Sequence, residues 1–303
     1  MKRILLTGLN SYIGTNLEHY LQEYNAKQGR ECYRVDSISQ RDDAWEQVDF
    51  TPYDTVLDVT GLAHADIGKV SKEEMVQYYD VNWKLAVNTA LKAQKEGVKQ
   101  FIYLSSSIVY GDSASLGKEK HITGKTRPQP ANFYGDSKWQ AEQELRTLET
   151  EQFQVAVLRL PFVYGAGCKG NYVFLSKAAE KIPVFPSVRN SRSMLYIENL
   201  NEFLRLLIEA GRGGLFFPQN AQYSSTSQLV QAIGAARGRK IHLWGILNPL
   251  VWLAAKCPGR VGRLTKKAFG SLTYDLNLSK EFAGYQRYDL QESIRRIEQK
   301  GKM

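Results

Sequence analysis

The stretch Arg3-Ile-Leu-Leu-Thr-Gly-Leu-Asn-Ser-Tyr-Ile-Gly14 decides the fold, because it joins a buried strand to a helix through a tight glycine turn. Residues 3–7 predict the strand, and Leu17 and Leu21 continue a helical pattern after the turn. Glycines let backbone N–H groups approach an anion, and the helix dipole favours negative charge there. The turn therefore predicts a cradle for the diphosphate of a dinucleotide. The expected cofactor-binding residues are Gly8, Asn10, Ser11, Tyr12, Ile13 and Gly14.

Strands and helices alternate after this turn, which predicts a parallel sheet covered on both faces. From about residue 166 the pattern becomes irregular. We predict an α/β fold, a Rossmann-like doubly wound parallel sheet with a smaller mixed substrate-binding lobe. The dinucleotide-binding domain is expected over 1–165 and the lobe over 166–303, with room for some lobe segments to return to the sheet. Strands are expected at 33–39, 55–59, 101–105 and 155–160, and helices at 73–95, 138–150, 172–181, 198–210, 226–236 and 289–299.

The composition predicts a cytoplasmic globular protein, with 43% apolar and 23% charged residues. The three cysteines form no C-x-x-C pair, which is typical of free thiols. The N-terminus lacks the apolar stretch of a signal peptide, and no apolar run reaches the roughly 18 residues of a membrane span. The four histidines are not spaced as ligands, so no metal site is predicted.

The net charge of +9 is concentrated in one region, because no acidic residue lies between Glu209 and Asp275 while nine basic residues do. A solvated face, an anionic ligand or an anionic membrane surface would each explain this charge. No nucleic-acid motif accompanies it, so nucleic acid is not expected as a partner. Residues Ile241–Ala255 are strongly apolar and predict either a helical flap or an interfacial segment. Peripheral membrane contact through 237–268 therefore stays open.

Tyr134 and Lys138 are spaced to share one face of a helix. A phenol is a poor base at neutral pH, but a nearby ammonium favours its ionised form. Ser106 could hold the substrate oxygen whose proton Tyr134 takes. Ser106, Tyr134 and Lys138 are thus the candidate catalytic residues, suited to removing a hydride from a carbon that bears a hydroxyl.

The second strand and the residues after it offer two candidate sets of residues that could bind the adenosine ribose. Asp36 lies where an acid would bind the ribose of NAD. Ser39 and Arg41 would instead suit the 2′-phosphate of NADP if the strand runs to Ser39. Asp49 and Phe50 are candidates for contact with the adenine. These alternatives leave NAD expected and NADP open.

Six motifs in order resemble the extended short-chain dehydrogenase/reductase family, in its nucleotide-sugar epimerase/dehydratase branch. The resemblance runs from residue 1 to about 299, with Ser11 and Asp58 as departures from the family pattern. The matching segments are Thr7–Gly14, Asp54–Gly61, Asn82, Ser105–Gly111, Tyr134–Glu142 and Arg159–Gly165.

The resemblance implies further site residues. A role in cofactor binding is implied for Thr60, Gly61, Asn82, Lys138 and Pro161. A role in binding the substrate is implied for Ser107, Asn171, Phe185 and Arg192, of which Arg192 would grip the diphosphate.

The activity implied by the resemblance is that of a nucleotide-sugar 4-epimerase, with a UDP-sugar as substrate. A 4-keto-sugar reductase of cell-surface polysaccharide synthesis is the alternative, since Gly270–Asp275 and Lys280 resemble a segment of such reductases. A 4,6-dehydratase is disfavoured because Ser107 and Ile108 stand where it has Asp-Glu. The resemblance also implies a homodimer that pairs through helices around 78–95 and 138–150.

Overall fold

A computed structural model describes residues 1–63 and 70–300, although the side chains of Asn171, Arg260 and Lys300 lie outside the description. The chain divides into two compact units. The sheet unit comprises Met1–Gly111, Arg127–Leu160 and Leu200–Pro218. The second unit comprises Asp112–Thr126, Pro161–Asn199 and Gln219–Met303.

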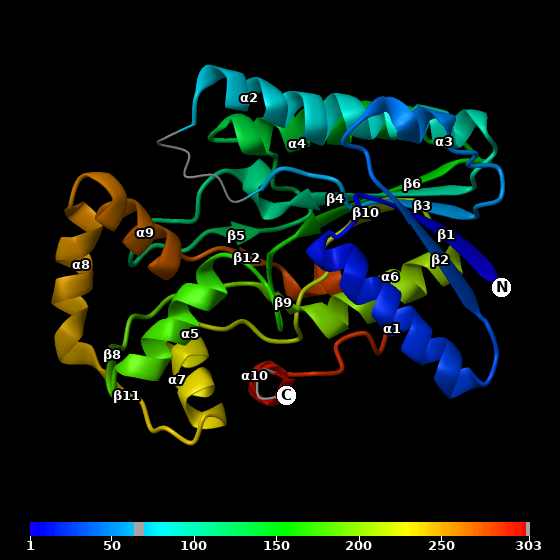
Figure 1. The fold of residues 1–303 in the computed structure, drawn as a ribbon. Coiled ribbons are helices and arrows are strands. Elements are labelled where there is room, and N and C mark those ends of the chain that lie inside the picture. Colours follow the sequence, from blue (N-terminus) through cyan, green and yellow to red (C-terminus); the bar gives the residue numbers. More distant parts are fainter. Residues whose placement is uncertain (64–69, 301–303) are drawn as a thin grey trace. The chain divides into compact units, whose positions relative to one another are not determined.

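The sheet unit is built on six parallel strands in the order β10-β6-β4-β3-β1-β2 (Figure 1). The first strand pairs with β2 on one side and β3 on the other, so the direction of winding reverses there. In doubly wound sheets such a reversal opens a ligand site at the carboxyl ends of the strands. The strands are β1 (Lys2–Thr7), β2 (Tyr33–Ile38), β3 (Thr55–Asp58), β4 (Gln100–Ser106), β6 (Gln154–Leu160) and β10 (Gly214–Phe216).

Helices cover both faces of this sheet (Figure 1). On one face, α3 (Ala86–Lys95) and α4 (Phe133–Thr147) bury apolar side chains against the strands. On the other face, α1 (Tyr12–Gln28) and α6 (Ile197–Ala210, whose residues from Leu200 on belong to this unit) are joined by a hydrogen bond from Tyr20 to Glu202. The predicted Rossmann-like α/β fold is therefore confirmed.

One predicted helix contains a local change of pitch. In place of a single helix over 73–95, α2 (Lys72–Tyr79) leads through a π-helical segment, Asp80–Leu85, into α3. Such segments are frequent at functional sites. Here the segment carries Asn82.

The structure differs from the sequence-based expectation at the start of α4. This helix begins at Phe133, whereas the sequence predicted its start at Lys138. Asn132 caps it by accepting a hydrogen bond from the N–H of Gly135 at 3.0 Å. Glycine weakens a helical pattern, which explains the late prediction. The longer helix places Tyr134 in its first turn, on the same helix as Lys138.

The second unit is assembled from helices and short strand pairs. The paired strands are β5 (His121–Ile122) with β12 (Thr273–Tyr274), β7 (Phe162–Tyr164) with β9 (Met194–Tyr196), and β8 (Val184–Pro186) with β11 (His242–Trp244). The helices are α5 (Asn171–Lys181), α7 (Thr226–Ala236), α8 (Asn248–Lys256), α9 (Gly259–Phe269) and α10 (Leu290–Lys300). Among the described residues, no helix is both long and apolar enough to cross a bilayer.

Candidate active site

The glycine turn lies at the carboxyl end of β1, where the winding reverses. Gly8 has a φ of +112°, and a Cβ on it would lie 2.9 Å from the backbone nitrogen of Thr60. Gly8 is therefore required both by the turn and by the close approach of the segment after β3. Ser11 has a φ of −70°, which any residue adopts. Ser11 accepts a hydrogen bond from the N–H of Gly14 at 3.1 Å and so caps α1, which explains why a serine can replace the family's middle glycine.

The end of β2 lies beside this turn. The carbonyl of Ile38 accepts hydrogen bonds from the N–H groups of Gly8 and Leu9 at 2.9 and 3.0 Å. Ser39 and Arg41 follow directly, and the hydroxyl of Ser39 accepts a hydrogen bond from the N–H of Arg41 at 3.3 Å. Asp36 lies within the strand, and the pKa of Tyr53 is raised mainly by burial and further by the Asp36 carboxylate. Ser39 therefore follows the residue whose carbonyl binds the glycine turn, whereas Asp36 is paired with Leu5 inside the sheet.

Asp49 and Phe50 differ in exposure. The ring of Phe50 is completely buried in the core between the sheet and its helices, beside Trp45. Asp49 is exposed, and its pKa is lowered by the side chain of Thr51 and by a hydrogen bond from the Thr51 N–H at 2.9 Å. The structure thus gives the Phe50 ring a packing role and leaves only Asp49 at the surface.

Asn82 secures the loop that follows β3. Its amide both donates to the carbonyl of Leu62 at 3.1 Å and accepts from the N–H of Leu62 at 2.9 Å. A Cβ on Gly61 would lie 3.2 Å from the Asn82 amide oxygen and 3.3 Å from Nζ of Lys138. Asn82 therefore holds Gly61 close to Lys138.

The sequence did not predict a role for Gln40. Its side-chain oxygen accepts a hydrogen bond from the hydroxyl of Thr60 at 2.7 Å.

Ser106 and Tyr134 are brought together by the end of β4 and the first turn of α4. The side chain of Ser106 lies near enough to the phenol to lower the pKa of Tyr134, and its Oγ accepts a hydrogen bond from the N–H of Ile108 at 3.3 Å. Burial of the phenol has the larger effect and raises its pKa above the ordinary value. This direction differs from the sequence-based expectation that Lys138 would lower the pKa, because burial penalises the phenolate in this structure.

Lys138 is almost completely buried one turn further along α4. Nζ donates a hydrogen bond to the carbonyl of Leu104 at 3.0 Å and lies 4.5 Å from the ring centre of Tyr103. Burial lowers the pKa of Lys138 to about 8, while the charges of Asp58 and Glu142 oppose this decrease. Burial thus makes the charged form of the Lys138 side chain less stable than it would be in water.

Asp58, which stands where the family has histidine, is one of the charges that support Lys138. Its Oδ1 accepts hydrogen bonds from the hydroxyl of Thr7 at 2.8 Å and from the N–H of Thr60 at 3.1 Å. Within residues 1–63 and 70–300, its Oδ2 is buried and has no hydrogen-bond partner. Burial raises the pKa of Asp58 to about 6, and the charge of Lys138 opposes this increase.

A buried ion pair joins α4, which carries Tyr134 and Lys138, to β6. The guanidinium of Arg159 on β6 donates to both carboxylate oxygens of Glu142 on α4, with a shortest distance of 2.6 Å. Glu142 also accepts a hydrogen bond from Ser105, the residue before Ser106. Arg159 further donates to the hydroxyl of Tyr110 at 2.5 Å. Breaking one member of such a pair would leave a buried charge uncompensated.

The remaining predicted residues occupy other parts of the structure. Ser107 begins the 3₁₀ turn Ser107–Tyr110 in the sheet unit. Pro161 is a buried residue at the start of a segment of the second unit. The side chain of Asn171 lies outside the described residues. Phe185 is buried and stacks on Phe269 with ring centres 5.9 Å apart.

Arg192 is bound to the end of α9. Its Nη1 donates to the backbone carbonyls of Lys267 at 2.9 Å and Ala268 at 3.2 Å. Burial lowers the pKa of this guanidinium to about 10. Carbonyls at a helix carboxyl end carry partial negative charge, so they offset part of the cost of burying the cation.

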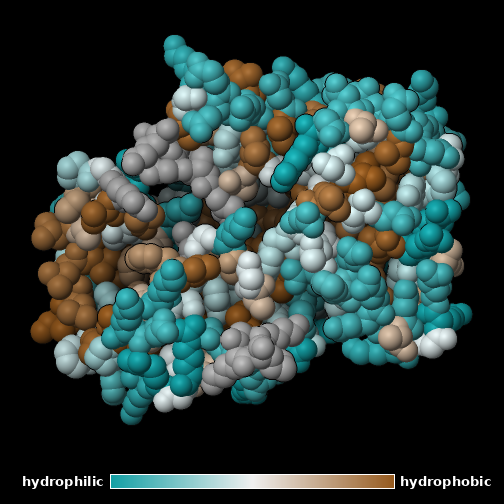
Figure 2. Space-filling view, viewed as in Figure 1, coloured by the Kyte–Doolittle hydropathy of each residue, from teal (hydrophilic) through white to brown (hydrophobic). Residues whose placement is uncertain are grey.

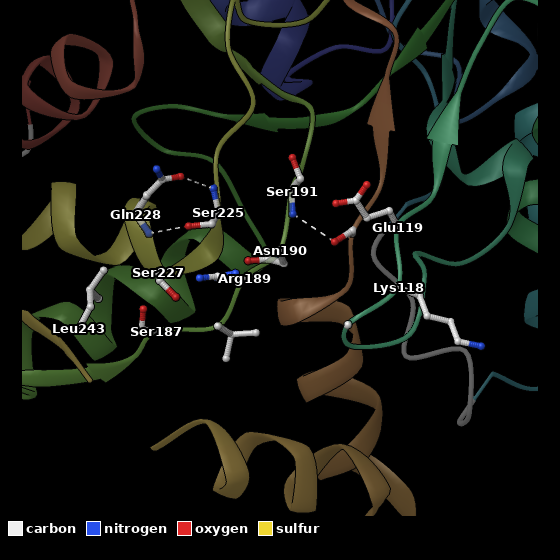
Figure 3. A pocket seen from close by; sticks show the side chains of 13 residues that line it. Lys118, Glu119, Ser187, Arg189, Asn190, Ser191, Ser225, Ser227, Gln228 and Leu243 are labelled. Atoms are coloured by element: carbon white, nitrogen blue, oxygen red, sulfur yellow. Dashed lines mark hydrogen bonds between the residues drawn. The ribbon is translucent and has the colours of Figure 1, made fainter. Parts of the chain in front are cut away.

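A cavity of about 670 Å³ lies within the second unit, next to the chain between Phe185 and Arg192 (Figure 3). Segments 117–119, 187–191 and 225–228 surround it, and its lining is rich in serine and amide side chains. Ser225 and Gln228 brace one wall through reciprocal hydrogen bonds at the start of α7. The cavity therefore presents polar groups that are held in place by their own hydrogen bonds.

Comparison with known proteins shows relatives along most of the chain. The chain is 28% identical over 282 residues to N-acetyl-alpha-D-glucosaminyl-diphospho-ditrans,octacis-undecaprenol 4-epimerase of Escherichia coli O157:H7, covering 88% of this chain and 82% of that protein. It is 29% identical over 321 residues to UDP-glucose 4-epimerase of Vibrio cholerae, covering 98% and 95%.

Solved structures share the fold. UDP-glucuronic acid 4-epimerase from Bacillus cereus, in complex with NAD, matches with a TM-score of 0.71 at 15% identity, over 98% of this chain and 96% of that one. dTDP-4-dehydrorhamnose reductase from Bacillus anthracis, in complex with NADP, matches with a TM-score of 0.67 at 17% identity, over 98% of both chains. The model of the NAD dependent epimerase/dehydratase family matches residues 4–216. Since this match spans the glycine turn, Ser106, Tyr134 and Lys138, the predicted resemblance is confirmed and the chain belongs to the NAD dependent epimerase/dehydratase family.

Proposed function

We propose that this protein is a UDP-sugar 4-epimerase that uses NAD. The observation that carries the proposal is the grouping of Ser106 and Tyr134 with buried Lys138 beside the glycine turn, all in one unit. The turn fits a dinucleotide, since a Cβ on Gly8 or Gly61 would fill the space beside Thr60 or Lys138. A nicotinamide bound there would accept a hydride from C4 of the sugar and return it.

Each catalytic residue has a distinct role in this proposal. Tyr134 takes the proton of the C4 hydroxyl and later returns it. Ser106 lies near Tyr134 and binds the same sugar oxygen. The ammonium of Lys138 favours the ionised phenol and binds the nicotinamide ribose. One of its three N–H groups donates to Leu104, which leaves the others for this role.

We propose that residues of the second unit bind the substrate and that Ser107 of the sheet unit contributes to this binding. We propose that Arg192 and Asn171 bind the diphosphate and that Phe185 lies near the base. The polar cavity beside residues 187–191 adds hydrogen-bonding groups to this proposal. For Arg192, Nη1 is already bonded to α9, so the phosphate oxygens would be bound by the rest of the guanidinium.

A lipid-linked sugar diphosphate is a second candidate substrate. The name of the E. coli relative describes a sugar diphosphate on undecaprenol, whereas the V. cholerae relative is named for UDP-glucose. Both substrates share a sugar joined to a diphosphate; they differ in the C2 substituent of the sugar and in the group beyond the diphosphate. Exposed Leu250 and Leu253 on α8 favour the lipid alternative, because they offer an apolar surface in the second unit.

A 4-keto-sugar reductase that uses NADPH remains the alternative reaction. The position of Ser39 and Arg41 just beyond β2 favours it, because a hydroxyl and a guanidinium suit a 2′-phosphate. A reductase needs the same Tyr134, Lys138 and Ser106 but transfers hydride in one direction.

The cofactor carried by the purified protein separates these two reactions. Denatured protein is analysed by mass spectrometry and absorbance, and the native enzyme is incubated with UDP-glucose while UDP-galactose is measured. About one tightly held NAD per chain and reversible interconversion without added cofactor are expected. An empty site that prefers NADPH and consumes it in one direction would replace the epimerase proposal with the reductase.

Three further features complete the proposal. We place the enzyme in the cytoplasm. We propose that two copies associate through the helices around 78–95 and 138–150, where Val76 and Leu91 are exposed nearby. We also propose peripheral contact between segment 237–268 and a membrane surface.

A further inference from the structure

The hairpin of α8 and α9 exposes more large apolar side chains than any other described part of the second unit (Figure 2). In Figure 2 they form the brown surface at the left edge, over α8. Ile246, Leu250 and Leu253 are 81%, 61% and 65% exposed, and they follow helical spacing as they lead into and along α8. The other exposed apolar residues here are Trp244, Trp252, Val261 and Leu264.

This exposure is not caused by loose packing of the hairpin. The opposite face of α8 buries Val251 and Ala255 against Leu116 and Val188. The ring of Trp252 lies so close to Gly117 that a Cβ there would be 2.7 Å from it. Since the inner face is packed, the outer face of α8 is held outward.

Basic side chains flank the apolar surface. Lys256 at the end of α8 and Lys266 and Lys267 at the end of α9 are exposed, as are Arg239 and Lys240 just before β11. No acidic residue occurs between Glu209 and Asp275, so this charge is not balanced along the chain. A surface that combines exposed leucine and tryptophan with lysine and arginine complements an anionic phospholipid bilayer.

The hairpin is also tied to the residue proposed to bind the substrate diphosphate. Arg192 donates to the carbonyls of Lys267 and Ala268 at the carboxyl end of α9. Val188 and Gly117, which contact α8, also line the polar cavity. A group that binds the outer face of the hairpin would therefore bind beside the proposed diphosphate site of the same unit.

We propose that the outer face of the α8–α9 hairpin docks on the surface of a bilayer that contains anionic phospholipids. Leu250, Leu253 and Ile246 enter the boundary between headgroups and acyl chains, and Lys266 and Lys267 lie at the level of the phosphates. A second copy of the chain is a poorer occupant, because two such hairpins would bring basic side chains together without acidic partners. The inference rests on the proposed membrane contact of segment 237–268 and names its partner and its orientation.

Co-sedimentation of the full chain with vesicles tests this docking without any turnover. Vesicles of phosphatidylcholine alone are compared with vesicles that also contain phosphatidylglycerol. The unmodified chain should bind the anionic vesicles and be released as salt is raised to about 0.5 M. Leu250→Ser with Leu253→Ser, and separately Lys266→Gln with Lys267→Gln, should each reduce the partition coefficient by roughly tenfold or more.

Matched controls remove equivalent groups elsewhere in the second unit. Phe174→Ser removes an exposed ring on α5, and Lys177→Gln with Lys181→Gln removes two exposed charges from that helix. These variants should bind vesicles like the unmodified chain. Equal losses in controls and hairpin variants would overturn the proposal, because the binding would then depend on total charge or hydrophobicity.

Two other outcomes would also overturn it. One is the absence of binding to anionic vesicles by the unmodified chain. The other is a smaller mass in light scattering when only the leucine pair is replaced, which would make a second copy the occupant.

Conversion of UDP-glucose is measured in parallel, since normal turnover without vesicle binding rejects the docking alone. Vesicle binding without turnover would reject the proposed reaction alone.

Discussion

At the scale of single residues, the site combines two ionisable groups that burial makes hard to charge. The pKa of Tyr134 is raised and that of Lys138 is lowered to about 8, in both cases mainly by burial. At neutral pH Tyr134 is therefore a neutral phenol, whereas Lys138 is still mostly an ammonium. The proposed proton transfer at Tyr134 therefore depends on the groups that stabilise the ammonium of Lys138 and the phenolate.

Replacing Tyr134 by phenylalanine should remove the proton acceptor while preserving the ring. We expect kcat for sugar epimerisation to fall about a thousandfold, within the usual range for loss of a general base. The amount of NAD released from the denatured variant should stay the same. Tyr79→Phe is the matched control, since the Tyr79 hydroxyl binds Asp136 and has no proposed catalytic role. Full activity of the Tyr134 variant would refute its role.

Asp58 should act as a positioning residue through the charge of Lys138. The Asp58 carboxylate raises the pKa of Lys138, so Asp58→Asn should bring that pKa below about 8. If the ammonium is the active form, the alkaline limb of kcat/KM moves to lower pH. A pH profile measured between about pH 6 and 10 checks this shift. An unmoved alkaline limb would show that Asp58 does not influence the reaction.

The same substitution has a consequence for stability. The pKa of Asp58 is about 6 in the folded protein and 3.8 ordinarily, so the folded state binds this proton more tightly. The stabilising contribution of this proton is complete below about pH 4 and is lost as the pH rises through 6. Urea unfolding of the unmodified chain and of Asp58→Asn at about pH 4 and 7 measures this loss, because the variant has no carboxyl group to titrate. The variant should gain stability relative to the unmodified chain at pH 7.

At the scale of elements, the ends of strands decide where the chemistry lies. The ends of β1, β2 and β3 meet where the winding of the sheet reverses. Gly8, Ser39 and Asp58 lie at or just past those ends. The end of β4 supplies Ser106, and the start of α4 supplies Tyr134. The Glu142–Arg159 pair holds α4 to β6 and so keeps this arrangement in register.

The glycine turn predicts a difference between two Gly→Ala substitutions. Gly8 and Gly29 both have positive φ, but only a Cβ on Gly8 meets other atoms, whereas nothing lies within 4 Å of one on Gly29. Gly29→Ala should lower the free energy of unfolding by about 1 kcal/mol, from backbone strain alone. Gly8→Ala should lower it by about 2–3 kcal/mol, because strain and collision add. Denaturant unfolding measures both, and equal costs would contradict the close approach of Thr60.

At the scale of the whole molecule, the two units carry different parts of the proposed reaction. The sheet unit holds the glycine turn and Ser106, Tyr134 and Lys138, whereas the second unit holds Phe185, Arg192 and the basic, apolar hairpin. The segment from Leu200 to Pro218 returns to the sheet unit and supplies β10 as its edge strand. The units are thus not successive halves of the chain.

The proposed dimer is tested on the helices of the sheet unit. Leu91 on α3 is 43% exposed, so it is available to a partner. Leu91→Glu should convert a dimer into a monomer, because it would bury a charge in an apolar contact. Light scattering coupled to size exclusion measures the mass. Phe174→Glu on α5 is the control and should leave the dimer intact; a monomeric unmodified chain would reject the dimer.

The sequence by itself determined the features that depend on near neighbours along the chain. The strand–turn–helix at residues 3–14 and the four-residue spacing of Tyr134 and Lys138 are local patterns, and so the fold class and the family could be predicted from them. Helix boundaries were less certain, as the start of α4 shows, because capping by Asn132 competes with the poor helix propensity of Gly135.

Only the tertiary structure decided which distant residues meet. The Asp58 charge that supports Lys138, the bond of Gln40 to Thr60, and the contact of Arg192 with the end of α9 join residues with no periodic relation in sequence. The outward orientation of Leu250 and Leu253 likewise depends on Val251 and Ala255 finding partners at Leu116 and Val188. Burial and charge act through space, and so the pKa values and exposed surfaces that control this site follow from packing rather than from sequence pattern.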